Sequence, residues 1–243
     1  MFSVFKKRAP IVADISWLGV DIHSHLLPGI DDGAKDIEES VSYIKRLKAL
    51  GFAKLICTPH IFTELYPNTK ETILPVLENV KQALIAQEIG IEIAAAAEYM
   101  VDDTFAVKNE HLALPGGYLL IEMSYLNETP NIEQVIFELQ IKGYIIILAH
   151  PERYNFYHHA HDRYLRLKDM GCLFQLNLLS ILGYYGKPVK FAAEYLLAEQ
   201  LYDLAGTDLH HDKHLTVLER AVRNGNLYNA IGKYGFKNIQ LFA

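Results

Sequence analysis

The fold-deciding stretch of the chain reads Gly19-Val20-Asp21-Ile22-His23-Ser24-His25-Leu26-Leu27-Pro28-Gly29-Ile30-Asp31-Asp32-Gly33. A short apolar strand ends here in His-x-His, and an acidic loop bounded by glycines follows it. Residues two apart on an extended strand point to the same face, so His23 and His25 can bind one metal ion together. Asp32, seven residues later, can add an oxygen ligand. Because neutral imidazole is also common in protein cores, the stretch alone leaves a metal site and an ordinary strand equally open.

Composition excludes several functional classes. Of the 243 residues 51 % are hydrophobic and 21 % are charged, which is typical of a soluble globular protein. The formal net charge of -6 argues against general nucleic-acid binding, which requires a basic face. No apolar run is long enough to cross a bilayer, and the basic residues Lys6, Lys7 and Arg8 are not followed by the apolar segment of a signal peptide. We therefore expect a cytoplasmic protein that has no transmembrane segment and binds no nucleic acid.

The two cysteines exclude one catalytic mechanism. Cys57 and Cys172 lie in apolar segments, which predicts buried, reduced thiols. Neither is followed six residues later by Arg, so the Cys-x5-Arg phosphate loop of the thiol-based phosphatases is absent from the sequence.

Apolar strand segments alternate with helical segments along the whole chain. The predicted strands are 19–25, 53–60, 92–99, 118–123, 144–151, 173–177 and 203–210. The predicted helices are 36–50, 70–88, 131–142, 162–170, 187–200 and 212–223, followed by a helical tail. Asp36 and Glu39 form the sequence pattern of a capping box at the first of these helices. Strands that are apolar almost throughout indicate a parallel sheet covered by helices.

Most of the predicted strands end in a residue that can bind a metal ion. These residues are His23, His25, His60, Glu98, Glu122, His150, Asp208 and His210. A closed or nearly closed barrel brings the carboxyl ends of its strands together, whereas an open sheet spreads them. We therefore predict an α/β fold, a distorted (β/α)7 TIM-like barrel in one domain spanning residues 19–243, preceded by an N-terminal extension of residues 1–18.

With Asp32 the candidate ligands number nine, which is more than one ion with an open position uses. Five histidines and four carboxylates suit two or three divalent ions with bridging carboxylates. Three such ions would leave about two positive charges after the four carboxylates, enough to attract a phosphate dianion. Mixed imidazole and carboxylate ligation is compatible with manganese, iron or zinc.

Together these motifs carry a family resemblance. They are Asp-x-His-x-His-x6-Asp over residues 21–32, Thr58-Pro59-His60, Ala97-Glu98-Tyr99, Ile121-Glu122, Ala149-His150-Pro151-Glu152-Arg153-Tyr154 and Thr207-Asp208-Leu209-His210. From about Gly19 to Arg223 the chain resembles the polymerase and histidinol phosphatase (PHP) superfamily. It is most similar to the branch of bacterial manganese-dependent protein-tyrosine phosphatases from capsular and exopolysaccharide operons.

The resemblance implies an activity and roles for individual residues. The nine candidates would be ligands of a trinuclear, manganese-favouring site, and Arg153 would hold the substrate phosphate. Hydrolysis would use a metal-activated water without a covalent enzyme intermediate, and the protein partner would be a tyrosine-rich polysaccharide-synthesis kinase. His60 or His210 could protonate the leaving oxygen.

The segment after the last motif departs from the family pattern. Relatives tend to carry a second Arg there, whereas Lys213 is the only permanent cation in His210-His211-Asp212-Lys213-His214. Lys offers a point charge rather than a bidentate fork, so phosphate binding from that side is expected to differ. Tyr154, together with Tyr184 and Tyr185, could line a slot for a phosphotyrosine ring. The alternative, that these tyrosines only pack at the rim, fits the sequence at least as well.

Other functions remain open at this stage. A small-molecule phosphatase acting on histidinol phosphate would use the same metal site. An amidohydrolase-type enzyme also begins with His-x-His but usually needs a Lys at a strand end, and no predicted strand here ends in Lys. A non-catalytic metal-binding module would not need the complete ligand set. The oligomeric state cannot be read from the sequence.

Overall fold

The computed structural model describes residues 11–108 and 110–243. Residues 1–10, which include the basic Lys6-Lys7-Arg8 cluster of the predicted extension, lie outside the described residues. The described strands are β1 (Val20–Asp21), β2 (Lys54–Cys57), β3 (His60–Ile61), β4 (Glu92–Ala95), β5 (Glu98–Met100), β6 (Tyr118–Glu122), β7 (Ile145–Ala149), β8 (Leu173–Asn177) and β9 (Leu204–Gly206).

All of these strands pair in parallel, in the orders β1-β2-β4 and β3-β5-β6-β7-β8-β9. The predicted strand over 53–60 is divided into β2 and β3 at Thr58-Pro59, and the one over 92–99 is divided into β4 and β5 at Ala96-Ala97. Two of the seven predicted strands, those over 53–60 and 92–99, therefore each contribute one observed strand to each of the two sheets.

The barrel closes between its last and first strand positions. Ser24 and Leu209 form a parallel bridge, the His25 N–H donates to Leu209 O at 2.9 Å, and the Asp208 N–H donates to His23 O at 2.7 Å. The predicted distorted (β/α)7 barrel is thus confirmed, and its distortion is the division into two sheets.

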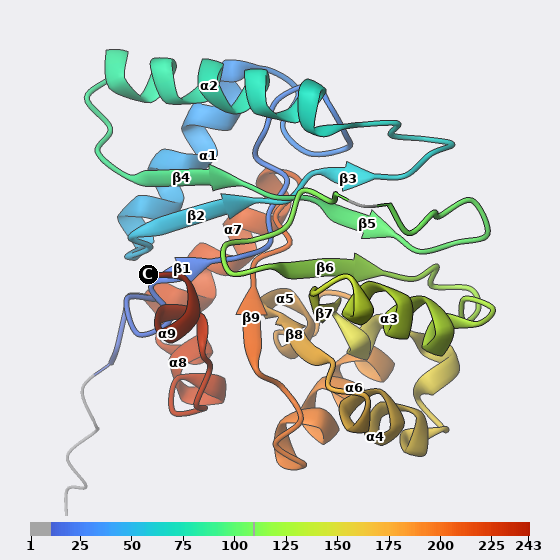
Figure 1. Cartoon of the computed structure of the whole chain (residues 1–243). Coiled ribbons are helices and arrows are strands. Elements are labelled where there is room, and N and C mark those ends of the chain that lie inside the picture. Colours follow the sequence, from blue (N-terminus) through green and yellow to red (C-terminus); the bar gives the residue numbers. More distant parts are fainter. Residues whose placement is uncertain (1–10, 109) are drawn as a thin grey trace, which may run out of the picture.

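Helices surround the strands (Figure 1). They are α1 (Ile37–Leu50), α2 (Lys70–Ala86), α3 (Ile132–Ile141), α4 (His161–Asp169), α5 (Leu178–Ile181), α6 (Lys187–Ala198), α7 (Asp212–Arg223), α8 (Asn226–Ile231) and α9 (Asn238–Phe242). At α1 the Asp36 carboxylate accepts from the Glu39 N–H as predicted, but the Glu39 carboxylate accepts from the Lys35 N–H, one residue before the cap. No helix among residues 11–108 and 110–243 is both long and apolar enough to span a membrane.

The interior of the barrel is filled by side chains from nearly every strand position. This inner cluster contains Val20, Ile22, Ile56, Ala96, Leu114, Leu120, Ile147, Ala149, Leu204 and Phe242. A larger apolar cluster fills the space between the strands and the outer helices. Because side chains occupy the barrel centre, polar groups can gather only at its ends.

Both chain ends of the described region pack against the amino end of the barrel. In α9 the Asn238 side-chain amide donates to Val20 O and to Ala205 O, at 2.9 and 2.7 Å. Ile15 and Leu18 are almost fully buried, so the last part of the predicted N-terminal extension contributes to the core. The domain boundary at residue 19 stays a prediction.

Candidate metal centre

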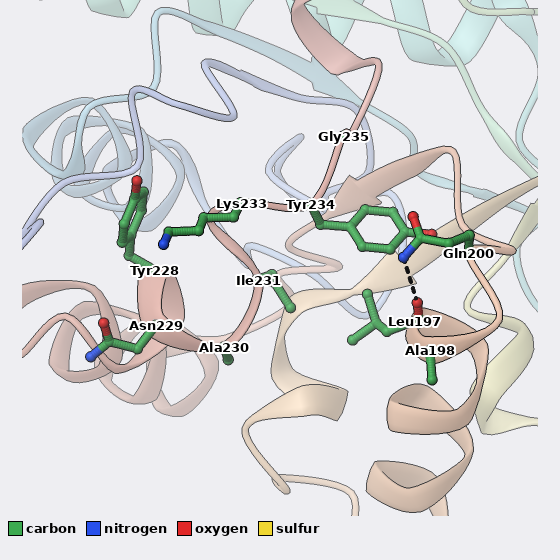
Figure 2. Close-up of a pocket in the computed structure, with 10 residues that line it drawn as sticks. All are labelled: Leu197, Ala198, Gln200, Tyr228, Asn229, Ala230, Ile231, Lys233, Tyr234 and Gly235. Atoms are coloured by element: carbon green, nitrogen blue, oxygen red, sulfur yellow. Dashed lines mark hydrogen bonds between the residues drawn. The ribbon is translucent and has the colours of Figure 1, made fainter.

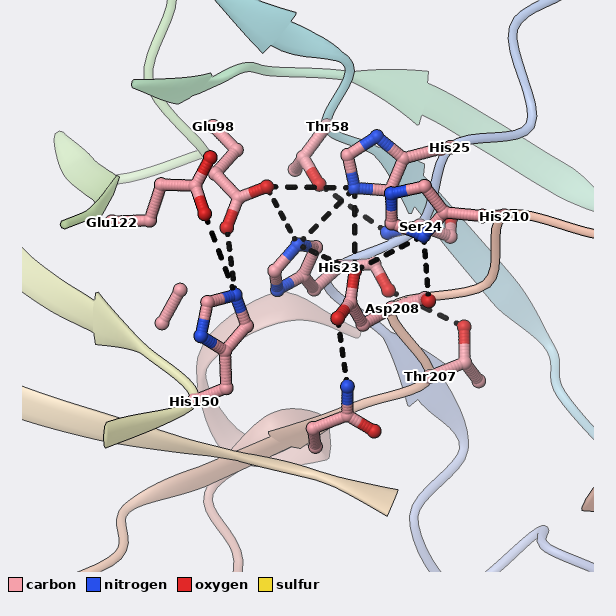
Figure 3. Close-up of polar contacts among 12 residues, drawn as sticks. His23, Ser24, His25, Thr58, Glu98, Glu122, His150, Thr207, Asp208 and His210 are labelled. Carbon is pink, nitrogen blue, oxygen red and sulfur yellow. Dashed lines mark hydrogen bonds and ion pairs between the residues drawn. The ribbon is translucent and has the colours of Figure 1, made fainter. Parts of the chain in front are cut away.

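The nine predicted ligands converge at the carboxyl end of the barrel, and seven of them are labelled in Figure 3. His23 and His25 follow β1, His60 begins β3, Glu98 begins β5 and Glu122 ends β6, while His150 follows β7 and both Asp208 and His210 follow β9. His60 and Glu98 are register partners in adjacent strands. Asp32 lies on the loop after β1, and its side chain is 52 % exposed.

The ligand atoms form three overlapping groups. The first contains His25, Asp32, His60 and His210, the second His23, His25, Glu98 and Asp208, and the third His60, Glu98 and Glu122. Within each group the ligand atoms lie within 4.8 Å of one another. His150 Nε2 adds a contact at 3.1 Å to Glu98 Oε1. His25, His60 and Glu98 each belong to two groups, which is the arrangement expected of neighbouring ion sites that share ligands.

The electrostatics of the cluster depend on opposite charges held close together. Burial favours the neutral form of Glu98, but His23 and the other histidines outweigh it and hold the Glu98 pKa well below its ordinary value. Burial likewise opposes protonation of His25, yet Asp31 and the neighbouring carboxylates raise its pKa well above the usual range. The buried carboxylates therefore require positive charge beside them.

Two buried atoms at the centre fit a bound cation. Glu98 Oε2 and His60 Nδ1 lie 3.2 Å apart, and neither makes a hydrogen bond. Buried polar atoms are almost always satisfied, so such pairs call for an explanation. A divalent cation would satisfy both atoms and balance the carboxylates. The donor set of imidazoles and carboxylates therefore fits divalent metal ions.

Asp31 was missed by the sequence analysis, which selected its neighbour Asp32. The Asp31 carboxylate is 2.8 Å from His25 Nδ1 and accepts the N–H groups of Gly33 and His60 at 2.9 and 3.1 Å. Although burial opposes ionisation, His25 and His60 lower the Asp31 pKa to about 2. Asp31 thereby fixes the ring of His25 with Nε2 facing the cluster. An alanine at Gly33 would bring its Cβ within 2.0 Å of His25 O, so the loop needs glycine there.

Gln175, Asn177 and Asp21 also hold the ligands and carried no predicted ligand role. Gln175 Oε1 is 2.8 Å from His23 Nδ1 and accepts the His150 N–H at 3.3 Å. The Asn177 amide donates to Asp208 Oδ2 at 2.7 Å, and its own oxygen caps α5. The Asp21 carboxylate accepts from the N–H and hydroxyl of Thr207. A polar residue inside an apolar strand, such as Gln175, is the sequence signal that could have revealed this layer.

Arg153 lies beside the cluster in a restrained position. Its Nη1 donates to Asp208 Oδ2 at 2.7 Å, and its guanidinium carbon is 4.4 Å from the ring centroid of Tyr125 and 4.2 Å from that of Tyr185. Burial opposes its charge, but Tyr125 and Asp208 raise its pKa further, so Arg153 is a permanent cation. Tyr125 was also missed, because it lies on an irregular loop.

A cavity of about 300 Å³ opens above the metal-ligand cluster. Its floor and walls combine metal-ligand candidates with Arg153 and with an apolar side formed by Phe62, Leu65, Tyr66 and Met100. Tyr154 does not reach this cavity: it is fully buried, and its hydroxyl donates to Ala149 O. The predicted substrate contact of Tyr154 does not fit this position. Lys213 is exposed on the first turn of α7 and does not line the cavity.

A larger cavity, of about 520 Å³, lies elsewhere, between the end of α6 and the α8 region (Figure 2). Its described lining residues include no His, Cys, Asp or Glu, and Gln200 uses its side-chain amide to donate to Leu197 O. Volume alone therefore does not identify the site, whereas the convergence of ligands does.

Known proteins share both the sequence and the fold. The chain is 29 % identical to tyrosine-protein phosphatase YwqE of Bacillus subtilis, over 80 % of this chain and 78 % of that protein. It is 30 % identical to the putative tyrosine-protein phosphatase CapC of Staphylococcus aureus, over 79 % of this chain and 76 % of that protein. A solved chain from work on YwqE of Bacillus subtilis and CpsB of Streptococcus pneumoniae, described as unique metal-dependent tyrosine phosphatases, matches the fold. Its TM-score is 0.75 at 24 % identity, covering 92 % of this chain and 95 % of that one.

The family model for capsular polysaccharide synthesis, CpsB/CapC, matches residues 19–224. This range contains all nine candidate ligands and Arg153. The chain belongs to the CpsB/CapC family of capsular polysaccharide synthesis proteins.

Proposed function

We propose that this chain is a metal-dependent protein-tyrosine phosphatase that works in the cytoplasm on a tyrosine kinase of polysaccharide synthesis. The observation that carries the proposal is the set of three overlapping ligand groups beneath a cavity that also presents Arg153. The relatives named tyrosine-protein phosphatases support the same reaction.

The nine candidates hold the ions in this proposal: His23, His25, Asp32, His60, Glu98, Glu122, His150, Asp208 and His210. Two or three divalent ions, Mn²⁺ in first place and iron or zinc as alternatives, would supply positive charge for the phosphoryl oxygens and lower the pKa of water. A ring nitrogen that binds an ion must be deprotonated. Asp31 contacts Nδ1 of His25 and Gln175 contacts Nδ1 of His23, so in both rings Nε2 is the nitrogen that faces the ion.

Arg153 binds and orients the phosphoryl group. Its guanidinium uses Nη1 on Asp208 and packs on two tyrosine rings, which leaves other N–H groups for phosphate oxygens. Holding the guanidinium rigidly reduces the entropy cost of orienting the ester. Lys213, the second predicted phosphate contact, lies outside the cavity and would reach the phosphoryl group only after a movement of the loop before α7.

The apolar side of the cavity suits an aryl ester. Phe62, Tyr66 and Met100 offer surface for a phenyl ring next to the ligand cluster. A phenol has a pKa of about 10, so its departure needs little proton donation. Both ring nitrogens of His60 already face cluster members, at 3.0 Å to Glu122 and 3.5 Å to Asp32. Those of His210 lie 3.0 Å from Asp208 O and 3.5 Å from Asp32. Metal ligation is therefore the main role we assign to both histidines, ahead of proton donation.

A cysteine nucleophile does not fit this site. Cys57 and Cys172 are buried, and burial raises the pKa of each thiol to about 12. This supports direct hydrolysis without a covalent enzyme intermediate.

The test compares turnover of a tyrosine-phosphorylated peptide and of histidinol phosphate, with Mn²⁺ added and after chelator treatment. We expect chelator-sensitive turnover of the peptide. His150→Ala should abolish it, whereas Arg153→Ala should weaken turnover and retain bound metal. Preference for histidinol phosphate would replace the proposal with a small-molecule phosphatase, and no turnover of either ester would refute phosphatase activity.

A further inference from the structure

A second cavity lies on the other side of the strands that carry the metal ligands. In the β3–β5 pair His60 is opposite Glu98, and Ile61 is opposite Tyr99. Successive strand residues point to opposite faces, so His60 and Glu98 face the catalytic cavity. Ile61 and Tyr99 line a separate groove of about 480 Å³. Met100 lines both cavities, so the two are neighbours at the end of β5.

We call this second cavity the flanking groove; it is formed by residues 61–71 on one side and by residues 99–108 and 110–112 on the other. Its apolar surface comes from Ile61, Phe105 and Leu112, which are half-buried and pack against the main core. Lys70 and Lys108 are matched in it by Glu71 and Glu110. The lining therefore favours an apolar occupant over a strongly charged one.

His111 is a neutral member of the lining of the flanking groove. The Lys108 N–H donates to His111 Nε2 at 3.2 Å, so the neutral ring carries its proton on Nδ1. Nδ1 is buried and has no hydrogen-bond partner. Burial and the positive charges of Lys108 and Lys142 lower the His111 pKa to about 4, which keeps the ring neutral near pH 7. The ring therefore adds no charge to the lining of the groove.

Both walls of the flanking groove are fixed in place. On the first wall the Asn68 amide donates to Ile30 O and His60 O at 2.7 and 2.9 Å, and Phe62 and Tyr66 exchange backbone hydrogen bonds. On the second wall the Leu112 N–H donates to the Tyr99 hydroxyl at 2.7 Å. A preformed groove costs little ordering entropy when a ligand binds.

We propose that the flanking groove binds the part of the substrate peptide next to the phosphotyrosine, with an apolar side chain on Ile61, Phe105 and Leu112. The proposal rests on the proposed phosphatase function. A peptide is the occupant we infer because Met100 lines both cavities, so residues next to a phosphotyrosine bound in the first cavity lie close to the second. The groove then selects protein substrates with apolar residues beside the phosphotyrosine over free aryl phosphates.

The test uses a variant that fills the groove from an exposed loop position. Ala106→Trp places a large side chain in the groove, and Ala86→Trp at the far end of α2 is the matched control. Each Mn²⁺-loaded protein is assayed with a Leu-flanked phosphotyrosine peptide, the same peptide with Gly and Ser flanks, and p-nitrophenyl phosphate.

The wild type should prefer the Leu-flanked peptide by roughly tenfold or more in kcat/KM. This is the gain expected from burying one apolar side chain once the entropy cost of binding is subtracted. Ala106→Trp should remove most of this preference, while p-nitrophenyl phosphate turnover stays within about twofold and Ala86→Trp matches the wild type. Equal turnover of the two wild-type peptides, an unchanged preference in Ala106→Trp, or an equal loss with p-nitrophenyl phosphate overturns the groove but leaves the phosphatase function standing. If the wild type hydrolyses none of the three esters, the proposed function and the groove both fall.

Discussion

Replacing Gln175 by Leu should weaken metal binding although Gln175 is not itself a predicted ligand. The side chain is fully buried, and its Oε1 serves both His23 Nδ1 and the His150 N–H. Leu fills a similar volume but accepts no hydrogen bond, so two buried donors lose their partner. At about 1–3 kcal/mol for each unsatisfied donor, we expect the free energy of unfolding to fall by roughly 2–6 kcal/mol. Loss of the contact that orients His23 should lower metal affinity about 10- to 100-fold.

Metal affinity is measured by isothermal titration calorimetry of the metal-free protein, and the free energy of unfolding by urea denaturation of the same samples. Gln175→Glu is the control, because it keeps an acceptor of the same length at Gln175 and should bind metal better than the Leu variant. Metal affinity in Gln175→Leu within about twofold of the wild type would refute the argument that this contact orients His23. A loss of stability without a loss of affinity would limit Gln175 to a packing role.

Three further outcomes follow from named contacts. Arg153→Lys keeps the charge but loses the planar guanidinium packed on Tyr125 and Tyr185. The KM for phosphotyrosine should therefore rise about tenfold, while the metal content measured by atomic emission stays unchanged; a wild-type KM would contradict this. Lowering the pH from 7.5 to 5 should release metal and activity together because protons compete for the ligand imidazoles, and full metal content at pH 5 would show that they are not ligands. In the fold the Asp203 pKa is lowered, since Lys168 and Lys237 outweigh the opposing effect of burial. Asp203→Asn should therefore lower the free energy of unfolding by roughly 1–3 kcal/mol above pH 4, with the difference from wild type shrinking as pH falls through the lowered folded pKa in urea titrations; a constant difference would argue against the ion pairs.

Much of the fold could be predicted because most of the predicted strands end in a residue that can bind a metal ion. Apolar runs closed by His or Glu mark the carboxyl ends, and the barrel then follows from the need to bring those ends together. The division of two strands could not be predicted with the same ease. Pro59 lacks an N–H and so explains the break between β2 and β3. The break at Ala96-Ala97 carries no comparable residue, since alanine fits either conformation.

The supporting residues were harder to predict because their partners lie far away in sequence. Gln175 is 152 positions from His23, and Arg153 meets Tyr125 and Tyr185 from two separate loops. Tyr154 shows the opposite failure: it follows Arg153 directly, so the sequence placed both at the phosphate. The 3-10 turn Pro151–Arg153 directs Arg153 toward the cavity and Tyr154 into the core.

Backbone strain is concentrated where the barrel presents its ligands. His150 and Asp208 have φ values of 33° and 48°, a region that costs a non-glycine residue of order 1–3 kcal/mol. Such residues persist only when their surroundings hold them, and here the His150 N–H is bound by Gln175 and the Asp208 N–H by His23 O. An alanine at Gly206 would place its Cβ 2.7 Å from that of His23, so the last strand approaches the first ligand without room to adjust. The contacts that orient the imidazoles are therefore the same ones that hold the strained turns, which is why losing Gln175 should affect stability and metal affinity together.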